Sequence, residues 1–211
     1  ATGDINGDKH NDLLISSGET NTCTIVFASS TVTWSLNMTA SSSNSIAIIG
    51  PAADDFGIFV ASGDINGDGF DDVFVGAYAA LSDSGRIYIV FGSASPSSFN
   101  ISSRMNPDGK TWSRITGNTI GGQVGAFIGV VHGKAGEGDG LLTGAAKIQG
   151  GLGFGYLIHQ SSTCKNISID GKNCSQCFEG YGLNSATRTC TQCLGNTWSD
   201  GTTDCLTCSK G

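Results

Sequence analysis

The chain has 211 residues, of which 14% are charged, 32 are glycine and only three are proline, and its formal charge is −7. This length allows one or two domains, and abundant glycine with little proline predicts a β-rich chain with tight turns. The negative charge argues against nucleic acid as a partner, and no apolar run approaches the ~20 residues that span a bilayer.

Cysteines and glycosylation sequons both indicate an oxidising, extracellular setting. Six of the eight cysteines lie in the last 38 residues, a density typical of secreted disulfide modules. Four Asn-x-Ser/Thr sequons predict N-glycans at Asn37, Asn100, Asn166 and Asn173. We expect a piece of a longer secreted protein or of the ectodomain of a membrane protein.

In chain order, the first unit opens with Asp4-Ile-Asn-Gly-Asp-Lys-His-Asn-Asp and the strand-like Leu13-Leu-Ile-Ser. Thr22–Ala28 predicts the next strand, and Ile46–Ile49 and Thr31–Asn37 are candidates for an outer strand. The first strand of this unit is predicted to be missing. Cys23 has no evident partner, so it is either a buried inert thiol or paired with another chain or segment.

The second unit repeats the first at an offset of 60 residues, position for position over Asp64–Gly76. Strands are predicted at Phe56–Ser62, Val73–Gly76, Arg86–Gly92 and Trp112–Thr116. Oxygen-bearing side chains occupy loop positions 1, 3, 5 and 9, and position 7 can offer a backbone carbonyl. These residues are Asp64, Asn66, Asp68, Asp72 and Phe70.

This spacing predicts a Ca²⁺ site, because Ca²⁺ takes 6–8 oxygen ligands. An EF-hand is excluded, since it needs a carboxylate at position 12, where Val75 stands, and an exiting helix. The loop therefore closes with Asp72 and runs into a strand. A solvated acidic turn is the alternative.

The third unit keeps the strands and loses the ligands. Val124–Val131 aligns with Phe56–Gly63, Leu141–Ala145 with Val73–Ala77, and Gly155–His159 with Tyr88–Gly92. His132, Lys134, Gly136 and Gly140 replace the four ligands, while Glu137 and Asp139 remain acidic at other positions. We predict no metal there.

Four-stranded units at intervals of about 60 residues predict an all-β fold of partial propeller blades. Three blades do not make a ring, because propellers close with ~4–8 blades. The remaining strands are expected from upstream sequence or from an assembly.

Phe56-Gly57, Gly63-Asp-Ile-Asn-Gly-Asp-Gly and Val75-Gly-Ala-Tyr resemble the FG-GAP repeat of integrin α-subunit β-propellers over roughly residues 1–160. The resemblance implies Ca²⁺ in the loop between the first two strands of a blade. In the first unit it implies the ligands Asp4, Asn6, Asp8, the His10 carbonyl and Asp12. Lys9 replaces the glycine of position 6, so a weaker first site is expected.

The predicted domains are the repeats at 1–160, divided near 1–50, 51–117 and 118–160, and a cysteine-rich module at 161–211. The module resembles growth-factor-receptor-like and ephrin-receptor-like cysteine-rich modules of large surface proteins, notably of protists. Paired CxxC units can hold zinc, but disulfides suit a secreted chain better. The cysteines predicted to form them are Cys164, Cys174, Cys177, Cys190, Cys193, Cys205 and Cys208.

The simplest disulfide pairing is a ladder of Cys164–Cys174, Cys177–Cys190 and Cys193–Cys205, with Cys208 paired beyond the segment. Such a segment would rely on its bridges for order and form a narrow stalk. Six cysteines alone allow 15 connectivities, so the ladder is a hypothesis.

No nucleophile, phosphate-loop or zinc-hydrolase motif is present, and His10, His132 and His159 form no ligand spacing. Asp54-Asp55 is interpreted as a turn, and Asp71 is expected to face solvent. The leading hypothesis is a non-enzymatic, calcium-stabilised extracellular protein for adhesion or structure. Its partners would be other surface proteins or copies of itself in a fibre or coat. The alternative is an accessory propeller of a secreted hydrolase such as a phospholipase.

Overall fold

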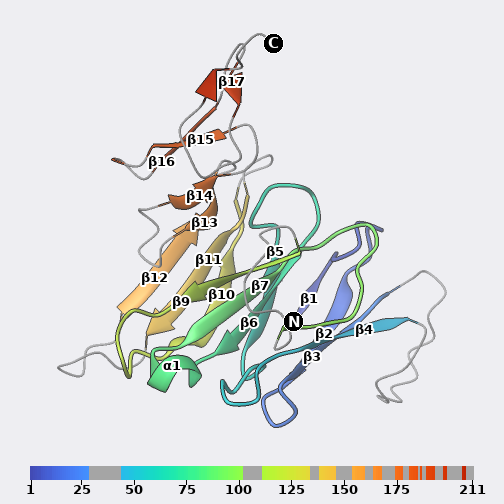
Figure 1. The fold of residues 1–211 in the computed structure, drawn as a ribbon. Coiled ribbons are helices and arrows are strands. Elements are labelled where there is room, and N and C mark those ends of the chain that lie inside the picture. Colours follow the sequence, from blue (N-terminus) through green and yellow to red (C-terminus); the bar gives the residue numbers. More distant parts are fainter. Residues whose placement is uncertain are drawn as a thin grey trace.

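The computed structural model describes residues 1–28, 44–101, 111–133, 138–145, 154–159, 164–167, 174–177, 181–184, 186, 189–192, 197–198 and 206–207. Within these ranges the fold is all-β, and the only helical element is the single turn α1 (Ala80–Asp83). Three larger sheets contain the repeats, and three two-stranded pairs follow them (Figure 1).

The first two sheets have the four-stranded antiparallel order of a blade. The first runs β1 (Thr2–Gly3), β2 (Asp12–Ser17), β3 (Thr22–Val26) and β4 (Ser45–Ile49). The second runs β5 (Val60–Gly63), β6 (Asp72–Ala77), β7 (Arg86–Val90) and β9 (Trp112–Thr116). A short strand from the second unit, β8 (Phe99–Asn100), pairs in parallel with β4. The second unit therefore contributes the edge strand of the first sheet.

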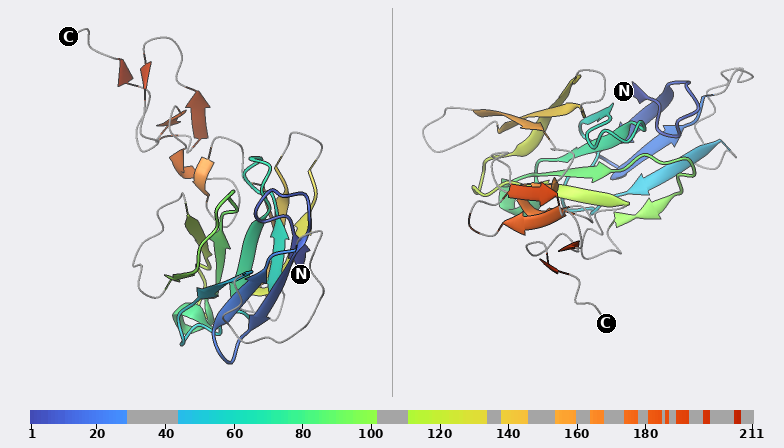
Figure 2. Two further views of the ribbon diagram at one scale, coloured as in Figure 1. Left: turned by 90° about the vertical axis from the view of Figure 1, so that its right-hand side faces the viewer. Right: turned by 90° about the horizontal axis from the view of Figure 1, so that it is seen from above.

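The third sheet has three strands, β10 (Val124–Val131), β11 (Gly140–Ala145) and β12 (Phe154–His159). The second sheet lies between the first and the third (Figures 1 and 2). This position explains why every residue of β6 is buried, since a strand covered on both faces reads as a continuous apolar run.

Two apolar clusters hold the sheets together. Because successive side chains of a strand alternate, Val73 and Val75 of β6 join Leu14 and Ile25 of the first sheet. Phe74 lies in the other cluster, with the third-sheet residues Ile128 and Leu141 at its far side. Burial of apolar surface contributes about 25 cal/mol per Å² to the free energy of folding, so these buried side chains are the main source of stability.

The first strand of the first unit, predicted to be missing, is present as β1. Gly3 pairs with Asp12 just as Gly63 pairs with Asp72, 60 residues further on. The predicted strand from Phe56 is shorter than expected and begins at Val60. The preceding residues form turns in which Asp55 and Gly57 have positive φ angles of 53° and 97°.

One predicted alignment is wrong by a single residue. The register places Tyr156 opposite Thr143, as Tyr88 is opposite Val75, so Tyr156 and not Gly155 corresponds to Tyr88. A one-residue slip reverses the face of every side chain. Leu157 therefore lies on the face away from the second sheet, where it is 47% exposed.

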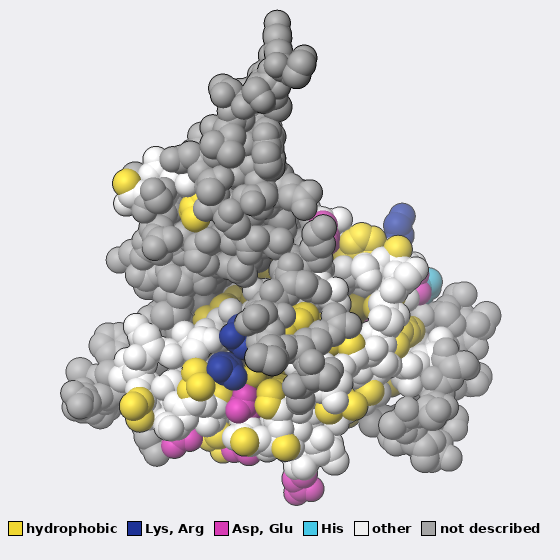
Figure 3. Space-filling view, viewed as in Figure 1, with side chains coloured by type: hydrophobic (Ala, Val, Ile, Leu, Met, Phe, Trp, Pro, Cys, Tyr) yellow, Lys and Arg dark blue, Asp and Glu magenta, His cyan; other side chains and the backbone are white. Residues whose placement is uncertain are grey.

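The outer face of the third sheet is open and apolar. It carries Phe127, 52% exposed, and Leu157, in strands that both pair with β11. The second sheet uses its equivalent face, with Phe74 and Ile89, to pack on the third. In the view of Figure 3, the described surface shows scattered apolar side chains and few charged ones.

The C-terminal segment forms three short antiparallel pairs that lead away from the sheets toward the C-terminus (Figures 1 and 2). They are β13 (Cys164–Ile167) with β14 (Cys174–Cys177), β15 (Tyr181–Asn184) with β16 (Thr189–Gln192), and β17 (Thr197–Trp198) with β18 (Leu206–Thr207). In backbone register Cys164 is opposite Cys177, whereas the predicted ladder joins Cys164 to Cys174, which is opposite Ile167.

The disulfide set and the glycans remain predictions. Cys193, Cys205 and Cys208 lie outside the described residues, as do Asn37, Asn173 and the candidate strand Thr31–Asn37. Cys23 is a free thiol, fully buried in β3, and burial raises its pKa to about 12. Among the described residues no helix has the length and apolar character that a membrane crossing requires.

Candidate metal-binding loops

The two acidic loops occupy equivalent places in the first two sheets. One spans residues 4–11 between β1 and β2, and the other spans residues 64–71 between β5 and β6. Each begins directly after a paired glycine, Gly3 or Gly63, and ends at a strand-opening aspartate, Asp12 or Asp72. The strand pairing thus brings the two ends of each loop together.

In the second loop, backbone N–H groups hold three of the predicted ligands. The two oxygens of Asp64 accept bonds from the N–H groups of Gly67 (2.7 Å), Asp68 (3.0 Å) and Gly69 (2.9 Å). Asn66 Oδ1 accepts from Asp68 N (2.9 Å). Asp68 Oδ1 accepts from Phe70 N at 3.0 Å. The backbone therefore winds around side chains at alternate positions.

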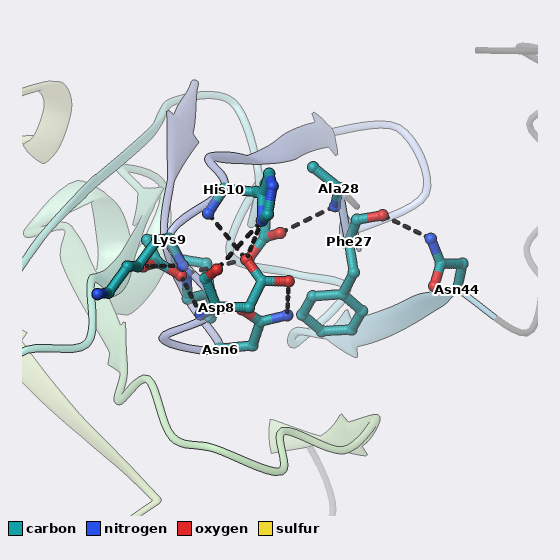
Figure 4. Close-up of polar contacts among 10 residues, drawn as sticks. Asn6, Asp8, Lys9, His10, Phe27, Ala28 and Asn44 are labelled. Carbon is teal, nitrogen blue, oxygen red and sulfur yellow. Dashed lines mark hydrogen bonds and ion pairs between the residues drawn. The ribbon is translucent and has the colours of Figure 1, made fainter. Parts of the chain in front are cut away.

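The first loop repeats this pattern (Figure 4). Asp4 accepts from Asp8 N (3.0 Å) and Lys9 N (2.9 Å), and Asp8 Oδ1 accepts from His10 N at 2.8 Å. Asn6 Nδ2 donates to Asp8 Oδ2 at 3.2 Å. Lys9 adopts a φ of +68° at the position where Gly69 has +89°, so a lysine holds a backbone conformation that favours glycine.

The position-9 aspartates are fully buried and bridge distant backbone groups. Asp72 accepts from Ile65 N and from Gly92 N, both at 3.0 Å. Asp12 does the same with Ile5 N and Ala28 N, also at 3.0 Å. Each carboxylate therefore ties its loop to the residue beyond the third strand, a role that the sequence pattern does not reveal.

Neighbouring loops are also joined to each other. Asp71 accepts from Asp4 N at 2.9 Å and is half-buried, so the expectation that it faces solvent is wrong. In the third unit, Asp139 accepts from Asp64 N at 3.1 Å. Burial, followed by the negative charges of Asp139, Asp64 and Asp4, raises the pKa of Asp71 although its backbone bond to Asp4 opposes this.

The predicted ligands do not form a preassembled cluster. Within the described part of the chain, no three His, Cys, Asp or Glu side chains are grouped as metal ligands. The carboxylates of each loop are instead turned onto backbone N–H groups. Four residues of the third unit stand where the second loop has its side-chain ligands. His132 Nδ1 lies 3.2 Å from Asp139 Oδ2, and Gly140 is the first residue of β11. Lys134 and Gly136 lie outside the described residues.

The donor set nevertheless fits Ca²⁺. Every candidate group is a carboxylate, amide or backbone oxygen, which suits a hard cation, and an oxygen that accepts one N–H keeps a second lone pair. Burial, and then the negative charges of Asp68 and Asp64, raises the pKa of Asp72 well above its ordinary value, against its two backbone bonds. A bound cation would offset this accumulation of buried negative charge.

Outside the two loops, the polar side chains of Asp54, Arg86 and Tyr88 bond to one another. Tyr88 donates its hydroxyl to Asp54 Oδ2 at 2.8 Å, and Arg86 Nη1 lies 3.4 Å from the same oxygen. This network ties the turn before β5 to β7, in agreement with the interpretation of Asp54 as a turn residue.

A hollow of about 280 Å³ between the first two units has Ile25, Val90 and Phe99 among its lining, and its polar side chains are only Ser and Thr hydroxyls.

The molecule is thus an all-β repeat protein in which an acidic loop connects the first two strands of a blade-like sheet. A family model, described as the FG-GAP repeat, matches residues 56–90, which contain β5, the second loop, β6 and β7. FG-GAP repeats are typical of extracellular or cell-surface proteins. No curated protein matches the chain.

Proposed function

We propose that the chain is the calcium-stabilised blade region of an extracellular structural or adhesion protein and has no catalytic activity of its own. The observation that carries this proposal is the doubled loop, in which matching hydrogen bonds hold oxygen-bearing side chains around buried Asp12 and Asp72. The disulfide-rich segment and the N-glycans belong to the same proposal.

In the second loop, the proposed ligands are the side chains of Asp64, Asn66, Asp68 and Asp72 with the Phe70 carbonyl. In the first they are those of Asp4, Asn6, Asp8 and Asp12 with the His10 carbonyl. Bound Ca²⁺ supplies positive charge that offsets the carboxylates and rigidifies the turn between two strands. The ion is structural in this proposal, and the protein's own residues orient its ligands.

Partners are proposed to be other surface proteins or further copies of the chain. The open apolar face with Phe127 and Leu157 supports this, since the equivalent face of the second sheet is covered by the third sheet. Regular filaments or concentration-dependent oligomers would support self-assembly. A monomer that binds a soluble ligand at every concentration would instead support adhesion.

Thermal melting with and without calcium tests the proposal. The parent chain is expected to melt higher in calcium than in chelator, because a ligand that binds only the folded state stabilises it by about 2.7 kcal/mol at 100 times its Kd. Asp68→Ala should lose the second loop's share of this gain, which is the larger share, and keep the smaller share of the first loop. Glu19→Ala removes the same charge from an exposed turn outside both loops and should keep the full gain.

Equal melting of the parent in calcium and in chelator would contradict calcium stabilisation. The same holds if Glu19→Ala and Asp68→Ala lose the gain equally, because the effect would then follow net charge and not the loop.

A further inference from the structure

A reciprocal pair of hydrogen bonds joins each acidic loop to the following repeat. Asp71 N donates to the Asp4 carbonyl at 2.9 Å, and Asp4 N donates to Asp71 Oδ2 at 2.9 Å. The same pair recurs one repeat later: Asp139 N donates to the Asp64 carbonyl at 2.6 Å, and Asp64 N donates to Asp139 Oδ2 at 3.1 Å. Both backbone groups of each loop's first residue are therefore held by an aspartate of the next repeat.

Asp71 and Asp139 occupy the same place in successive repeats. Each directly precedes the first residue of the second strand, Asp72 in β6 and Gly140 in β11. The third repeat has thus lost the position-9 carboxylate, where Gly140 stands, but keeps the carboxylate beside it. This explains why an acidic residue persists in a loop that has lost its own ligand pattern.

A glycine makes room for the incoming carboxylate in both cases. A Cβ built on Gly63 would lie 2.6 Å from Asp139 Oδ2, and one on Gly3 would lie 2.7 Å from Asp71 Oδ2. Real Cβ atoms do not approach that closely. The residue before each loop therefore leaves space that the next repeat fills.

The third repeat also holds Asp139 in place. Its Oδ1 accepts from Gly133 N at 2.9 Å, and its Oδ2 lies 3.2 Å from His132 Nδ1. Its side chain is 14% exposed although that of His132 is 80% exposed. The carboxylate is thus a fixed part of the connection between β10 and β11.

We propose that Asp71 and Asp139 are positioning residues, each supplied by one repeat to set the cation affinity of the loop in the repeat before it. They act on Asp4 and Asp64, the first ligands of the two loops, and the inference rests on the calcium binding proposed above. The third repeat lacks the ligand pattern in its sequence and serves the second site. Holding a ligand's backbone before binding raises affinity, because less ordering remains to be done when the ion arrives.

Calcium titration calorimetry in single-site backgrounds tests this assignment. Asp8→Ala leaves only the second site, and Asp68→Ala leaves only the first. In the Asp8→Ala background, Asp139→Ala is expected to weaken calcium binding about tenfold, the equivalent of one hydrogen bond. In the Asp68→Ala background, Asp71→Ala should weaken the first site to a similar extent.

Each aspartate is expected to act on the loop of the preceding repeat and not on its own loop, which distinguishes positioning from a local structural role. Asp71 belongs to the second loop, yet its alanine variant should weaken the first site more than the second. Asparagine variants separate position from charge, because Asn keeps an acceptor oxygen and lacks the negative charge. Asp139→Asn should therefore bind calcium more tightly than Asp139→Ala. Gly63→Ala, which crowds Asp139 Oδ2 and Val130 Cγ1 without changing any charge, should also weaken the second site.

A calcium-independent measurement separates failure of this inference from failure of the proposed function. In chelator, amide hydrogen exchange at Asp64 should accelerate in Asp139→Ala and stay unchanged at Asp4, with the reverse in Asp71→Ala. The inference is overturned if exchange is unaffected, if Ala and Asn variants weaken binding equally, or if Asp71→Ala acts only on the second site. A different result would overturn the proposed function: hydrogen exchange changes as expected, but calcium binds in neither background. In that case the proposed effect on calcium affinity also fails, while the reciprocal hydrogen bonds between repeats are supported.

Discussion

The first and second loops share a backbone course and six of nine residues, and they differ at positions 6, 7 and 8. Both wind their backbone around an aspartate at position 1, and both end at a buried aspartate with two backbone donors. At position 6, Lys9 has a φ of +68° and Gly69 a φ of +89°. The same carboxylate–backbone hydrogen bonds hold both loops, and a side chain at position 6 is expected to add strain to that shared backbone.

The third loop extends the comparison. It keeps neither the position-1 nor the position-9 aspartate, having His132 and Gly140 there, but Asp139 still reaches the second loop. A repeat without the ligand pattern can therefore still hydrogen-bond to the loop of its neighbour.

The largest expected effect comes from removing the buried aspartate at position 9 of either loop, Asp12 or Asp72. Asp72→Ala should lower the free energy of unfolding by about 3 kcal/mol even in chelator, because it leaves two backbone N–H groups unpaired. Asp12→Ala should cost less, since Ala28, one of its donors, is half-buried. Urea unfolding in chelator measures both values.

Asp72→Asn serves as the control, since it keeps one acceptor and should fall between the parent and Asp72→Ala. If Asp72→Ala unfolded like the parent in chelator, the carboxylate would act only through calcium, contrary to the geometry.

A smaller effect is expected from exchanging the residues at position 6. Lys9→Gly should stabilise the metal-free protein by about 1 kcal/mol, the cost of a left-handed residue that carries a side chain. Gly69→Lys should destabilise it by a similar amount, and a Cβ there meets no atom within 4 Å, so the effect is confined to the backbone. Thermal or urea unfolding in chelator gives both values.

In calcium, each of these two single substitutions should also bring the two site affinities closer together. Gly69→Ala is the matched control, because it imposes the backbone strain without a charge. Equal stability of the parent and both exchanged variants would show that position 6 imposes no strain on the loop.

Local pattern was enough to predict much of the fold. Trp112–Thr116 is a strand with the predicted bounds, and β6 and β7 differ from prediction only at their ends. These segments are short β-branched and apolar runs between glycine-rich turns, so neighbouring residues carry the signal. The all-β class followed from the same signal repeated three times.

Contacts between repeats were not predictable from the same pattern. Asp71 was expected to face solvent because nothing near it in sequence is a partner, whereas Asp4, its donor, lies 67 residues away. The one-residue error at Gly155 has a related cause, because register is set by pairing with β11 and not by composition. The acidic residues that persist in the third loop without a ligand pattern, Glu137 and Asp139, were the available signal, but sequence alone does not choose between them.

The most direct test of the account is a calcium titration of the parent chain by calorimetry, repeated with Asp8→Ala and Asp68→Ala. We expect two sites of unequal affinity: Asp68→Ala removes the tighter one and Asp8→Ala the weaker one. Absence of binding would contradict it, and so would two equal sites or a tighter site that persists in Asp68→Ala.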